Sequence, residues 1–347
     1  AGSDPHGEFV GKNILLRRHP LAEAARRFGL AEDEAAARLT EARAILLEAR
    51  RKRPLPHRDD KILTAWNGLA VSALAVGAQV LEDARYRDAA VRAASFLLGA
   101  MKGPDGRLLR AYRQGPGTVG GFAEDYAFLI AGLLDLHEAT LETRWLKEAL
   151  ALQKTMDALF LDVRQGGYFS SAEGDPTLPL RMKEEYDGAE PAPHSVAAGN
   201  LLRLHRLTGD EAFRDRAQAL FRAARPLLER APDAVPRLLG ALEESLLPPL
   251  HLVIVGPPEA ESEATRALLR EARRGFAPHR ALLRFSPGEP IPELFGALAP
   301  FYASLRQVDG KPTAFLCEDF ACRLPTSDPV VLRNSLEKHS QPPGEVI

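Results

Sequence analysis

The stretch 56–70 reads PHRDDKILTAWNGLA, and it decides the fold because it places charged residues, an indole and an amide at the start of a long apolar helix. That helix is predicted from Thr64 onward, where large apolar residues recur among alanines at Leu69, Leu74, Val76 and Val80. A helix that is apolar nearly all round belongs inside a protein. Its first turn has free backbone N–H groups that attract polar and anionic ligands. We therefore predict that the start of this helix opens a ligand site.

Five polar or aromatic side chains in or near this first turn are candidate site residues: His57, Asp59, Asp60, Trp66 and Asn67. His57 and Asp60 are candidate catalytic groups, and the other three are candidate substrate ligands. In sugar sites, aromatic rings cover the apolar faces of the pyranose while carboxylates and amides bind its hydroxyl groups. Two structural alternatives stay open, because one of the aspartates can cap the helix and the indole can pack in the core.

Composition argues against several classes of partner. The chain has 347 residues, 45% of them hydrophobic, which is enough for one large core or two modest ones. Its net charge of −2 creates no field that would attract nucleic acid or an anionic membrane surface. The sequence shows no run of about 18 apolar residues and no signal-peptide pattern, so we expect a soluble, cytoplasmic protein. The chain starts at Ala1 without a methionine, so a targeting segment ahead of it stays open.

Three similar stretches predict helical hairpins along the chain. In each, an apolar helix ends, a short acidic turn follows, and an aromatic residue opens a more amphipathic helix. The three aromatic residues are Tyr86, Trp145 and Phe213. Two further helices are expected before them, over 20–28 and 31–51. Recurring hairpins of this kind indicate a toroid in which the apolar helices form the inner ring.

When the three units are aligned on these aromatic residues, their inner helices start with different groups at equivalent places: Trp66 and Asn67, then Asp125 and Tyr126, then Pro193 and His194. Unlike side chains at one structural position are what a shared ligand site uses. The alternatives are that Asp125 caps its own helix and that His194 is structural.

Two long segments lead into these starts, 103–121 with Arg110, Tyr112 and Arg113, and 162–193, and both carry further candidates. Long connections between regular elements are more often functional or disordered than idle. The second segment contains three candidate substrate ligands and a candidate catalytic carboxylate: Arg181, Lys183, Glu184 and Asp187. A solvated surface run is the alternative for these charges.

Two kinds of sugar chemistry fit these candidates. Hydrolysis needs two carboxyl groups that flank the scissile bond, and Asp60 with Asp125 or Asp187 would supply them. Epimerisation needs an acid and a base on opposite faces of a sugar carbon, and His57 with His194 would supply those. Neither chemistry requires a cofactor, and none is expected.

After Pro248-Pro249 the pattern changes to strands that alternate with helices. Strands are predicted over 251–256, 281–285 and 313–317, which indicates a small α/β subdomain with a parallel sheet. The domains are therefore expected at 1–248 and 249–347. Cys317 and Cys322 do not have the spacing of a usual zinc or thioredoxin site, so no metal is expected. Two free, mostly buried thiols are predicted, and a reversible disulfide is the alternative, which requires a tight turn between the two residues.

Several motifs together resemble a known family. They are Gly11-Lys12-Asn13-Ile14-Leu15, Arg53-Pro54-x-Pro56-His57-x-Asp59-Asp60-Lys61-x-Leu63-Thr64-x-Trp66-Asn67-Gly68-Leu69, Asp125-Tyr126-Ala127, Gly166-Gly167-Tyr168-Phe169, Asp187-Gly188-Ala189 and Cys317-Glu318-x-Phe320-Ala321-Cys322-x-x-Pro325. The chain resembles, over nearly its whole length, the spermatogenesis-associated, thioredoxin-domain-containing family. That resemblance implies a mainly α fold, an (α/α) six-hairpin-type toroid similar to N-acylglucosamine and cellobiose epimerases, with the small C-terminal α/β subdomain. It also implies an N-terminal half with a thioredoxin-like domain that this chain lacks.

Two functions of different classes follow. The first is a carbohydrate-active domain, epimerase-like or glycoside-hydrolase-like, that takes a small-molecule sugar or glycan. The second is a non-catalytic binding or scaffold domain that presents a substrate or partner to the thioredoxin-like domain. The helices predicted before Pro248 are too few to close a ring, so the first and last inner helices are expected to expose apolar flanks.

Overall fold

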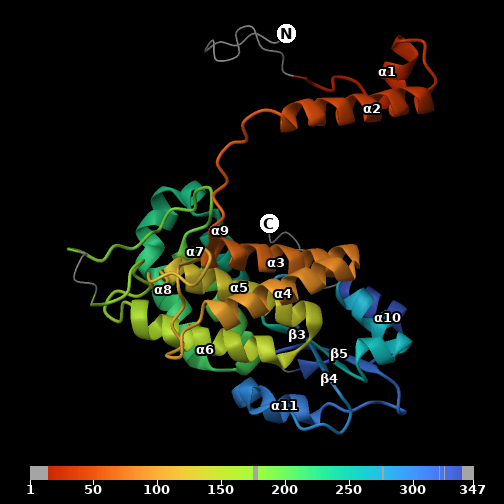
Figure 1. Cartoon of the computed structure of the whole chain (residues 1–347). Coiled ribbons are helices and arrows are strands. Elements are labelled where there is room, and N and C mark those ends of the chain that lie inside the picture. The colour runs from red at the N-terminus through yellow and green to blue at the C-terminus, as the bar shows by residue number, and fades with distance from the viewer. Residues whose placement is uncertain (1–14, 175–178, 276, 320, 324, 338–347) are drawn as a thin grey trace. The chain divides into compact units, whose positions relative to one another are not determined.

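The computed structural model describes residues 15–174, 179–275, 277–319, 321–323 and 325–337 (Figure 1). The chain forms two compact units, of which the first ends at Asp60 and the second begins at Lys61. The first unit contains α1 (Leu21–Arg27) and α2 (Glu32–Arg51), which confirms both predicted helices. The motif residues Gly11 to Ile14 and Phe320 lie outside the described residues. The domain boundary predicted at 248/249 stays a prediction.

The second unit begins with three consecutive helical hairpins, as the repeats predict. They are α3 (Thr64–Leu81) with α4 (Ala84–Ala100), α5 (Ala123–Thr140) with α6 (Thr143–Phe160), and α7 (Pro193–Thr208) with α8 (Glu211–Arg230). The three aromatic residues Tyr86, Trp145 and Phe213 each occupy the third position of the outer helix. The repeat signal therefore located the hairpins and their register correctly.

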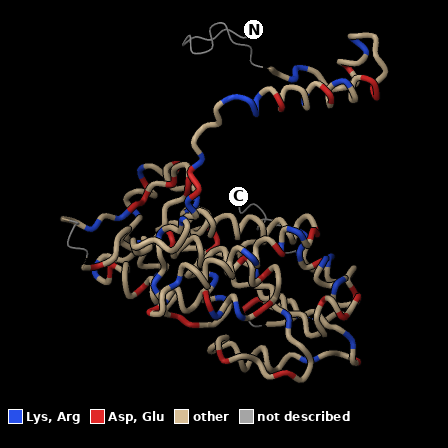
Figure 2. Tube along the Cα trace, viewed as in Figure 1, with Lys and Arg blue, Asp and Glu red and all other residues tan. Residues whose placement is uncertain are grey.

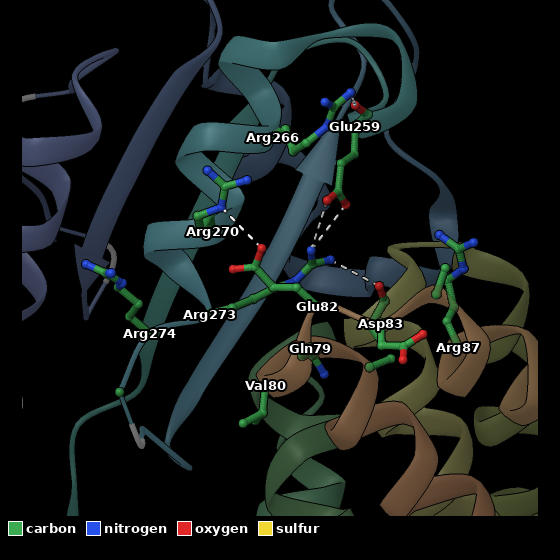
Figure 3. Close-up of a pocket in the computed structure, with 14 residues that line it drawn as sticks. Gln79, Val80, Glu82, Asp83, Arg87, Glu259, Arg266, Arg270, Arg273 and Arg274 are labelled. Carbon is green, nitrogen blue, oxygen red and sulfur yellow. Dashed lines mark hydrogen bonds and ion pairs between the residues drawn. The ribbon is translucent and has the colours of Figure 1, made fainter. Parts of the chain in front are cut away.

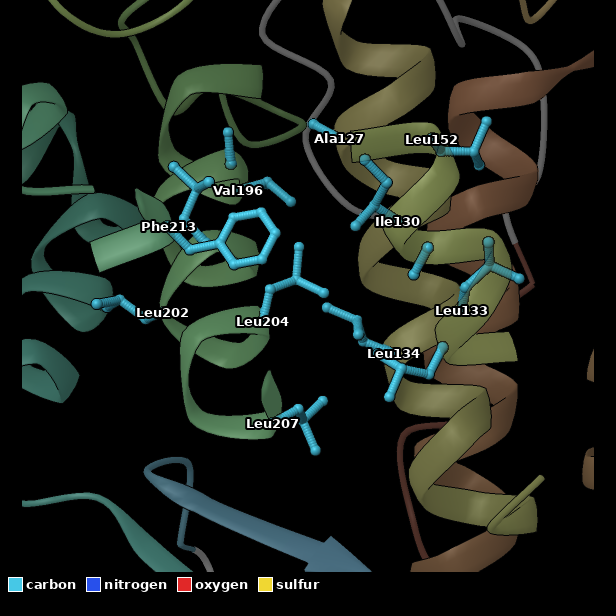
Figure 4. Close-up of a cluster of buried hydrophobic side chains, with 14 of the residues drawn as sticks. Ala127, Ile130, Leu133, Leu134, Leu152, Val196, Leu202, Leu204, Leu207 and Phe213 are labelled. Atoms are coloured by element: carbon cyan, nitrogen blue, oxygen red, sulfur yellow. The ribbon is translucent and has the colours of Figure 1, made fainter. Parts of the chain in front are cut away.

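The inner helices α3, α5 and α7 lie side by side, with α5 in the middle. Close approach of α3 and α5 depends on two glycines, because a Cβ at Gly68 would lie 2.6 Å from the Leu129 nitrogen and one at Gly132 would lie 2.6 Å from the Gly68 oxygen. Between α5 and α7 the core is filled by interleaved aliphatic side chains, among them Ile130, Leu134 and Leu204 (Figure 4). This mainly α architecture is an arc of (α/α) hairpins.

The first and the last inner helix, α3 and α7, differ in how other elements cover them. Most residues of α7 are buried, because α9 (Pro236–Leu246) and the 3-10 helix η3 (Glu293–Leu298) pack against it. On α3, by contrast, Val76, Val80 and Leu81 are exposed. The predicted apolar flank is therefore confirmed for α3 and wrong for α7, where later elements of the chain cover the helix.

Among the described residues, α3 is also the helix that is long and apolar enough to cross a membrane by length and composition. The sequence analysis had found no such stretch, and this part of it is wrong. The finding is weak evidence for a membrane, because the core helix of a soluble protein passes the same test. Val71 and Ala75 of α3 are fully buried in the main hydrophobic core.

A four-stranded sheet follows the hairpins. It contains β3 (Leu250–Val255), β4 (Arg280–Phe285), β5 (Thr313–Glu318) and β6 (Ala321–Cys322) in the order β4-β3-β5-β6. The strands β3 and β4 are parallel, but β5 runs antiparallel to β3, so the prediction of a purely parallel sheet is wrong. The helical crossover that parallel strands need joins only β3 to β4, through α10 (Glu263–Ala272).

Each face of the sheet belongs to a different core. Residues such as Val253 and Phe315 join the core of the helical hairpins, while Leu252 and Leu316 pack with α10 and α12 (Pro329–Glu337). The remaining short elements are the 3-10 helices η1 (Pro232–Ala234) and η2 (Glu259–Glu261), and α11 (Ala299–Ser304). Lysines and arginines are interspersed with acidic residues along the second unit, as the near-zero net charge predicts (Figure 2).

The two cysteines form a disulfide, so the prediction of free thiols is wrong. Strands β5 and β6 make a tight antiparallel hairpin that sets Cys317 directly opposite Cys322. The alternative of a disulfide, which required a tight turn between the two cysteines, is confirmed. Cys317 is fully buried, whereas Cys322 lies on an exposed strand.

Candidate functional site

The start of α3 is fixed by a short two-stranded sheet that the sequence analysis did not predict. In it, β1 (Ile62–Leu63) pairs antiparallel with β2 (Ala111–Tyr112). Next to this sheet, the Thr64 backbone N–H donates to the Arg110 carbonyl at 3.1 Å, and the Thr64 hydroxyl donates to the Leu109 carbonyl at 2.5 Å. The loop between α4 and α5 is thereby fastened to the first residue of α3.

Asp125 ties the starts of α3 and α5 together. It is fully buried, and its Oδ1 accepts from the Ala65 backbone N–H, a first-turn donor of α3, at 2.9 Å. Its Oδ2 accepts from the Phe122 N–H at 2.8 Å and from the Arg110 guanidinium at 3.2 Å. Burial raises the pKa of Asp125 to about 6, against the opposing effect of these donors. The predicted capping role is confirmed and extends to a second helix.

The aromatic and charged groups around Asp125 form what we call the mouth: Trp66, Arg110, Glu124, Glu184 and Glu190. Of these, Arg110 and Glu124 are partly buried, and the other three are exposed. Trp66 is 60% exposed, and its Nε1–H donates to Glu190 Oε2 at 2.9 Å, across 124 positions of sequence. Arg110 forms an ion pair with Glu124, the residue before Asp125. The mouth therefore combines an exposed indole with carboxylates and one guanidinium.

Side-chain contacts connect the members of the mouth. Glu190 contacts Trp66, and Glu124 is linked through Arg110 and Asp125 to Ala65, the residue before Trp66. Burial raises the pKa of Glu184, the neighbouring carboxylates of Glu124 and Glu190 raise it further, and Arg110 lowers it. Segments far apart in sequence thus meet at the starts of α3 and α5.

Three charged residues of the long segment 162–193 hold that segment in place: Arg181, Lys183 and Asp187. The Asp187 carboxylate accepts from the backbone N–H groups of Ala192 and Arg237, both at 2.8 Å, and so joins the starts of α7 and α9. Arg181 donates to the Ser171 and Leu159 carbonyls. These side chains hold the segment that carries Glu184 to the mouth.

Lys183 is anchored in the same way. It lies 2.7 Å from the Asp162 carboxylate and donates to the Gly166 carbonyl at 2.8 Å. Of the charged candidates in this segment, Glu184 is the one that lies at the mouth. The other three, Arg181, Lys183 and Asp187, have defined partners, so they are not a purely solvated surface run.

Three other candidates lie at the predicted helix starts but not in the mouth. Tyr126 is fully buried, its ring packs against Phe160, and its hydroxyl accepts from the Leu108 N–H at 2.7 Å. It therefore belongs to the core rather than to a ligand surface. The Asn67 amide donates to the Leu63 carbonyl at 2.8 Å, within the first turn of α3.

His194, in the first turn of α7, is 2% exposed. Burial lowers its pKa to about 4, and Lys183 lowers it further. Its Nδ1 lies 3.5 Å from the Tyr168 N–H, and its Nε2 has no hydrogen-bond partner among the described residues. Gly167 lies against the ring, because a Cβ there would come within 2.0 Å of it. The structure thus encloses this imidazole in its neutral form.

The remaining candidates His57, Asp59 and Asp60 belong to the first unit, and their predicted roles stay predictions. The N-cap of α3 is Leu63, which supplies no side-chain hydrogen bond, and Asp125 satisfies a first-turn N–H from the neighbouring helix instead. Within the described part of the chain, no group of three or more histidine, cysteine or acidic side chains could hold a metal ion.

Sequence reasoning missed two members of the mouth, Glu124 and Glu190. Glu124 directly precedes Asp125 in the first turn of α5, so the alignment of helix starts identified the residue next to it. Glu190 ends the long segment just before Pro191, three residues ahead of α7. Its closeness to a helix start was the available signal, but its contact with Trp66 is a tertiary one.

The fold and this mouth define a class, an (α/α)-hairpin protein with a polar, aromatic-lined face at the starts of its inner helices. The chain is 42% identical over 343 residues to spermatogenesis-associated protein 20 of Homo sapiens, and 40% identical over 348 residues to that of Mus musculus. These alignments cover 96% and 97% of the chain but 43% and 44% of the relatives, so the chain spans less than half of their length. No family model matches the chain.

Solved structures with a partial likeness include a cellobiose 2-epimerase from Bacillus thermoamylovorans, with 16% identity and a TM-score of 0.41 over 51% of this chain and 46% of that one. A GH76 α-mannanase from Bacteroides thetaiotaomicron has 15% identity and a TM-score of 0.39 over 50% of this chain and 47% of that one. The argument for a function therefore rests on the mouth itself.

Proposed function

We propose that the chain binds a sugar or glycan at the mouth and acts on it by acid–base chemistry between two carboxyl groups. The observation that carries this proposal is the exposed Trp66 ring, which Glu190 holds at the edge of an otherwise acidic face. An indole that only packed in the core would be buried. An indole held in solvent beside carboxylates presents the mixed apolar and hydrogen-bonding surface that a pyranose requires.

The acid–base pair in this proposal is Glu184 with Glu124. The pKa of Glu184 is raised by burial and by its acidic neighbours, which favours the protonated form that a general acid needs. Glu124 is ion-paired with Arg110 and supplies the second carboxylate. A pair of this kind matches the requirement of glycoside hydrolysis for one acid and one carboxylate that acts as base or nucleophile.

The histidine pair considered for epimerisation receives less support from the site. Transfer of a proton to a sugar needs an imidazole that reaches the ligand, and His194 is 2% exposed and enclosed by Gly167. Asp125 and Asp187 are likewise occupied by backbone donors, so they hold the site in place in this proposal. Two glutamates of the mouth, Glu184 and Glu124, take the chemical roles.

The test of binding is thermal unfolding of the full chain against a panel of monosaccharides and disaccharides. A specific sugar at 100 times its dissociation constant should add about 2.7 kcal/mol to the free energy of unfolding. Trp66→Ala should weaken this sugar about ten-fold, which corresponds to about 1.4 kcal/mol. Val80→Ala is the matched control, because it truncates an exposed apolar residue at the other end of the same helix.

The test of chemistry uses Glu184→Gln and Glu124→Gln with the sugar that binds. Both variants should keep binding and lose turnover by about 100-fold or more, the usual contribution of a general acid or base. Glu173→Gln, an exposed glutamate of the same long segment, should retain full turnover. If sugars bind but none is turned over, the mouth is a binding site and the non-catalytic alternative holds. If no sugar stabilises the wild type, the proposal fails.

A further inference from the structure

A second cavity system lies at the other end of the inner helices. One cavity, of about 640 Å³, lies between the end of α3, the start of α4 and helix α10 (Figure 3). A second, of about 770 Å³, lies between the start of α6 and the segments that follow β3 and β4. The two cavities share Arg87, Ala139, Glu259 and Arg266 in their walls. The two cavities are therefore adjacent, and we call them together the arginine groove.

Most guanidinium groups of the arginine groove already have a partner. Arg273 contacts the Glu259 carboxylate at 3.2 Å (Figure 3). It also donates to the Ala139 carbonyl, in the last turn of α5, at 3.0 Å. Arg270 lies 3.4 Å from Glu82. These arginines are explained by ion pairing and by the favourable interaction of cations with helix C-termini.

Arg284, near the end of β4, is different. Its side chain is half-buried, and its Nη1 donates to the Gly256 carbonyl at 3.0 Å and to the Ser286 hydroxyl at 3.1 Å. Among the described residues no carboxylate lies within ion-pair distance of it, and its Nε and Nη2 have no hydrogen-bond partner. Burial lowers the pKa of Arg284, and the carboxylates of Glu289 and Glu261 act against this from beyond ion-pair distance. The free Nε and Nη2 edge can therefore accept an anion without breaking an ion pair.

The position of Arg284 also favours a ligand. β3 and β4 are adjacent parallel strands, and the walls of the second cavity are built by the residues after their carboxyl ends, Pro258 and Ser286 among them. In open α/β sheets, ligands bind outside the carboxyl ends of parallel strands. Arg284, whose Nε and Nη2 have no hydrogen-bond partner within the described ranges, therefore lies where the ends of two parallel strands favour a ligand site.

We propose that the arginine groove binds the phosphoryl group of a small phosphate monoester, with Arg284 as its principal ligand. The free Nε and Nη2 edge of a guanidinium matches two oxygens of a phosphate. Arg144, in the wall of the same cavity, is 56% exposed and pairs with Glu142 two residues away. Exposed pairs of this kind contribute little to stability, so Arg144 can turn to a dianion at small cost.

The experiment is calorimetric titration of the full chain with inorganic phosphate, glycerol phosphate and acetate at constant ionic strength. Both phosphates should bind at a single site, and acetate, with one negative charge, should bind about ten-fold more weakly. Arg284→Gln should weaken both phosphates about ten-fold or more, because it removes two charge-assisted hydrogen bonds. Tighter binding of glycerol phosphate than of inorganic phosphate identifies the ligand as a monoester.

Two further variants keep this test decisive. Arg144→Gln lies on the surface and should fold normally while weakening phosphate a few-fold. Arg225→Gln, whose exposed side chain pairs with Glu229 on α8, is the control and should bind phosphate as the wild type does. Undiminished phosphate binding by Arg284→Gln overturns the proposal. So does the absence of binding at about 10 mM phosphate, or acetate binding as tight as phosphate.

Discussion

The mouth and the arginine groove lie at opposite ends of the same two helices. Trp66 and Glu124 belong to the first turns of α3 and α5, whereas Glu82 caps the end of α3 and Ala139 lies in the last turn of α5. The first turn of α5 carries Glu124 and Asp125, as the helix dipole favours. Both ends combine the two signs of charge, since Arg110 lies at the mouth and Glu82 and Glu259 line the groove.

The two ends differ in how their polar groups are held. At the mouth end, the fully buried Asp125 and the nearly buried His194 lie beneath the exposed groups. In the groove, pairs such as Arg270 with Glu82 are about half exposed, with side-chain exposures of 46% and 60%. A site supported by buried contacts is preorganised, whereas a surface lined by exposed pairs can rearrange around a ligand. The predictions below test this difference.

The largest effect is expected from Asp125→Ala. This change leaves the N–H groups of Ala65 and Phe122 without their acceptor and removes a buried partner of Arg110. We expect the free energy of unfolding to fall by roughly 3 kcal/mol in urea denaturation followed by circular dichroism. Glu124→Ala, which removes the more exposed partner of Arg110, should cost no more than about 1 kcal/mol. Equal losses in the two variants would show that Asp125 is not the main tie.

The next effect concerns pH at the start of α7. Burial lowers the pKa of His194 to about 4 in the folded chain. As the pH falls below 6.5, His194 therefore binds a proton in the unfolded chain but not in the folded chain. His194 therefore stabilises the fold above pH 6.5, and this contribution is lost as the pH falls towards 4. Between pH 7 and pH 5 the loss amounts to about 2 kcal/mol.

The measurement compares unfolding of the wild type with that of His194→Gln at pH 7 and pH 5. The wild type should lose about 2 kcal/mol more than the variant over this interval. Asp125 acts in the opposite direction, because its pKa of about 6 is raised and its contribution is gained as the pH falls. That contribution is common to both proteins and cancels in the comparison. Identical losses would mean that the imidazole is accessible to protons in the folded state.

The smallest effect is expected in the groove, from Arg270→Ala. The Arg270 and Glu82 side chains are exposed and 3.4 Å apart, and pairs of this kind contribute between 0 and about 1 kcal/mol. We expect a change below about 0.5 kcal/mol in the free energy of unfolding, and less still at high salt. A loss above about 1 kcal/mol would show that the groove is as firmly held as the mouth.

Much of the fold could be predicted from local pattern. The aromatic residues Tyr86, Trp145 and Phe213 located three hairpins, because each opens an outer helix at the same position of its unit. The start of α3 at Thr64 was also predicted correctly. The direction of β5 was not, because strand alternation reports that a strand exists and not which neighbour it pairs with.

The sequence predicted where the candidate site lies, but it predicted only some of the residues that form it. The equivalent helix starts brought Trp66 and Asp125 into consideration, and the long segment 162–193 brought Glu184. The structure places all three in or next to the mouth. Tyr126 sits next to Asp125 in sequence, yet it points into the core, since neighbouring residues of a helix face different directions. Sequence alone does not say which of two adjacent residues faces the ligand.

The sequence by itself determined the helical hairpins, their order and the polar character of the inner helix starts, because helix periodicity and capping are local properties. Tertiary structure decided which side chains meet, as in the contact of Trp66 with Glu190 and in the pairing that bridges Cys317 to Cys322. It also decided that Asp125 is buried while Glu124 is ion-paired in the mouth. Burial and long-range pairing depend on how separate helices pack, and one segment of sequence does not contain that information.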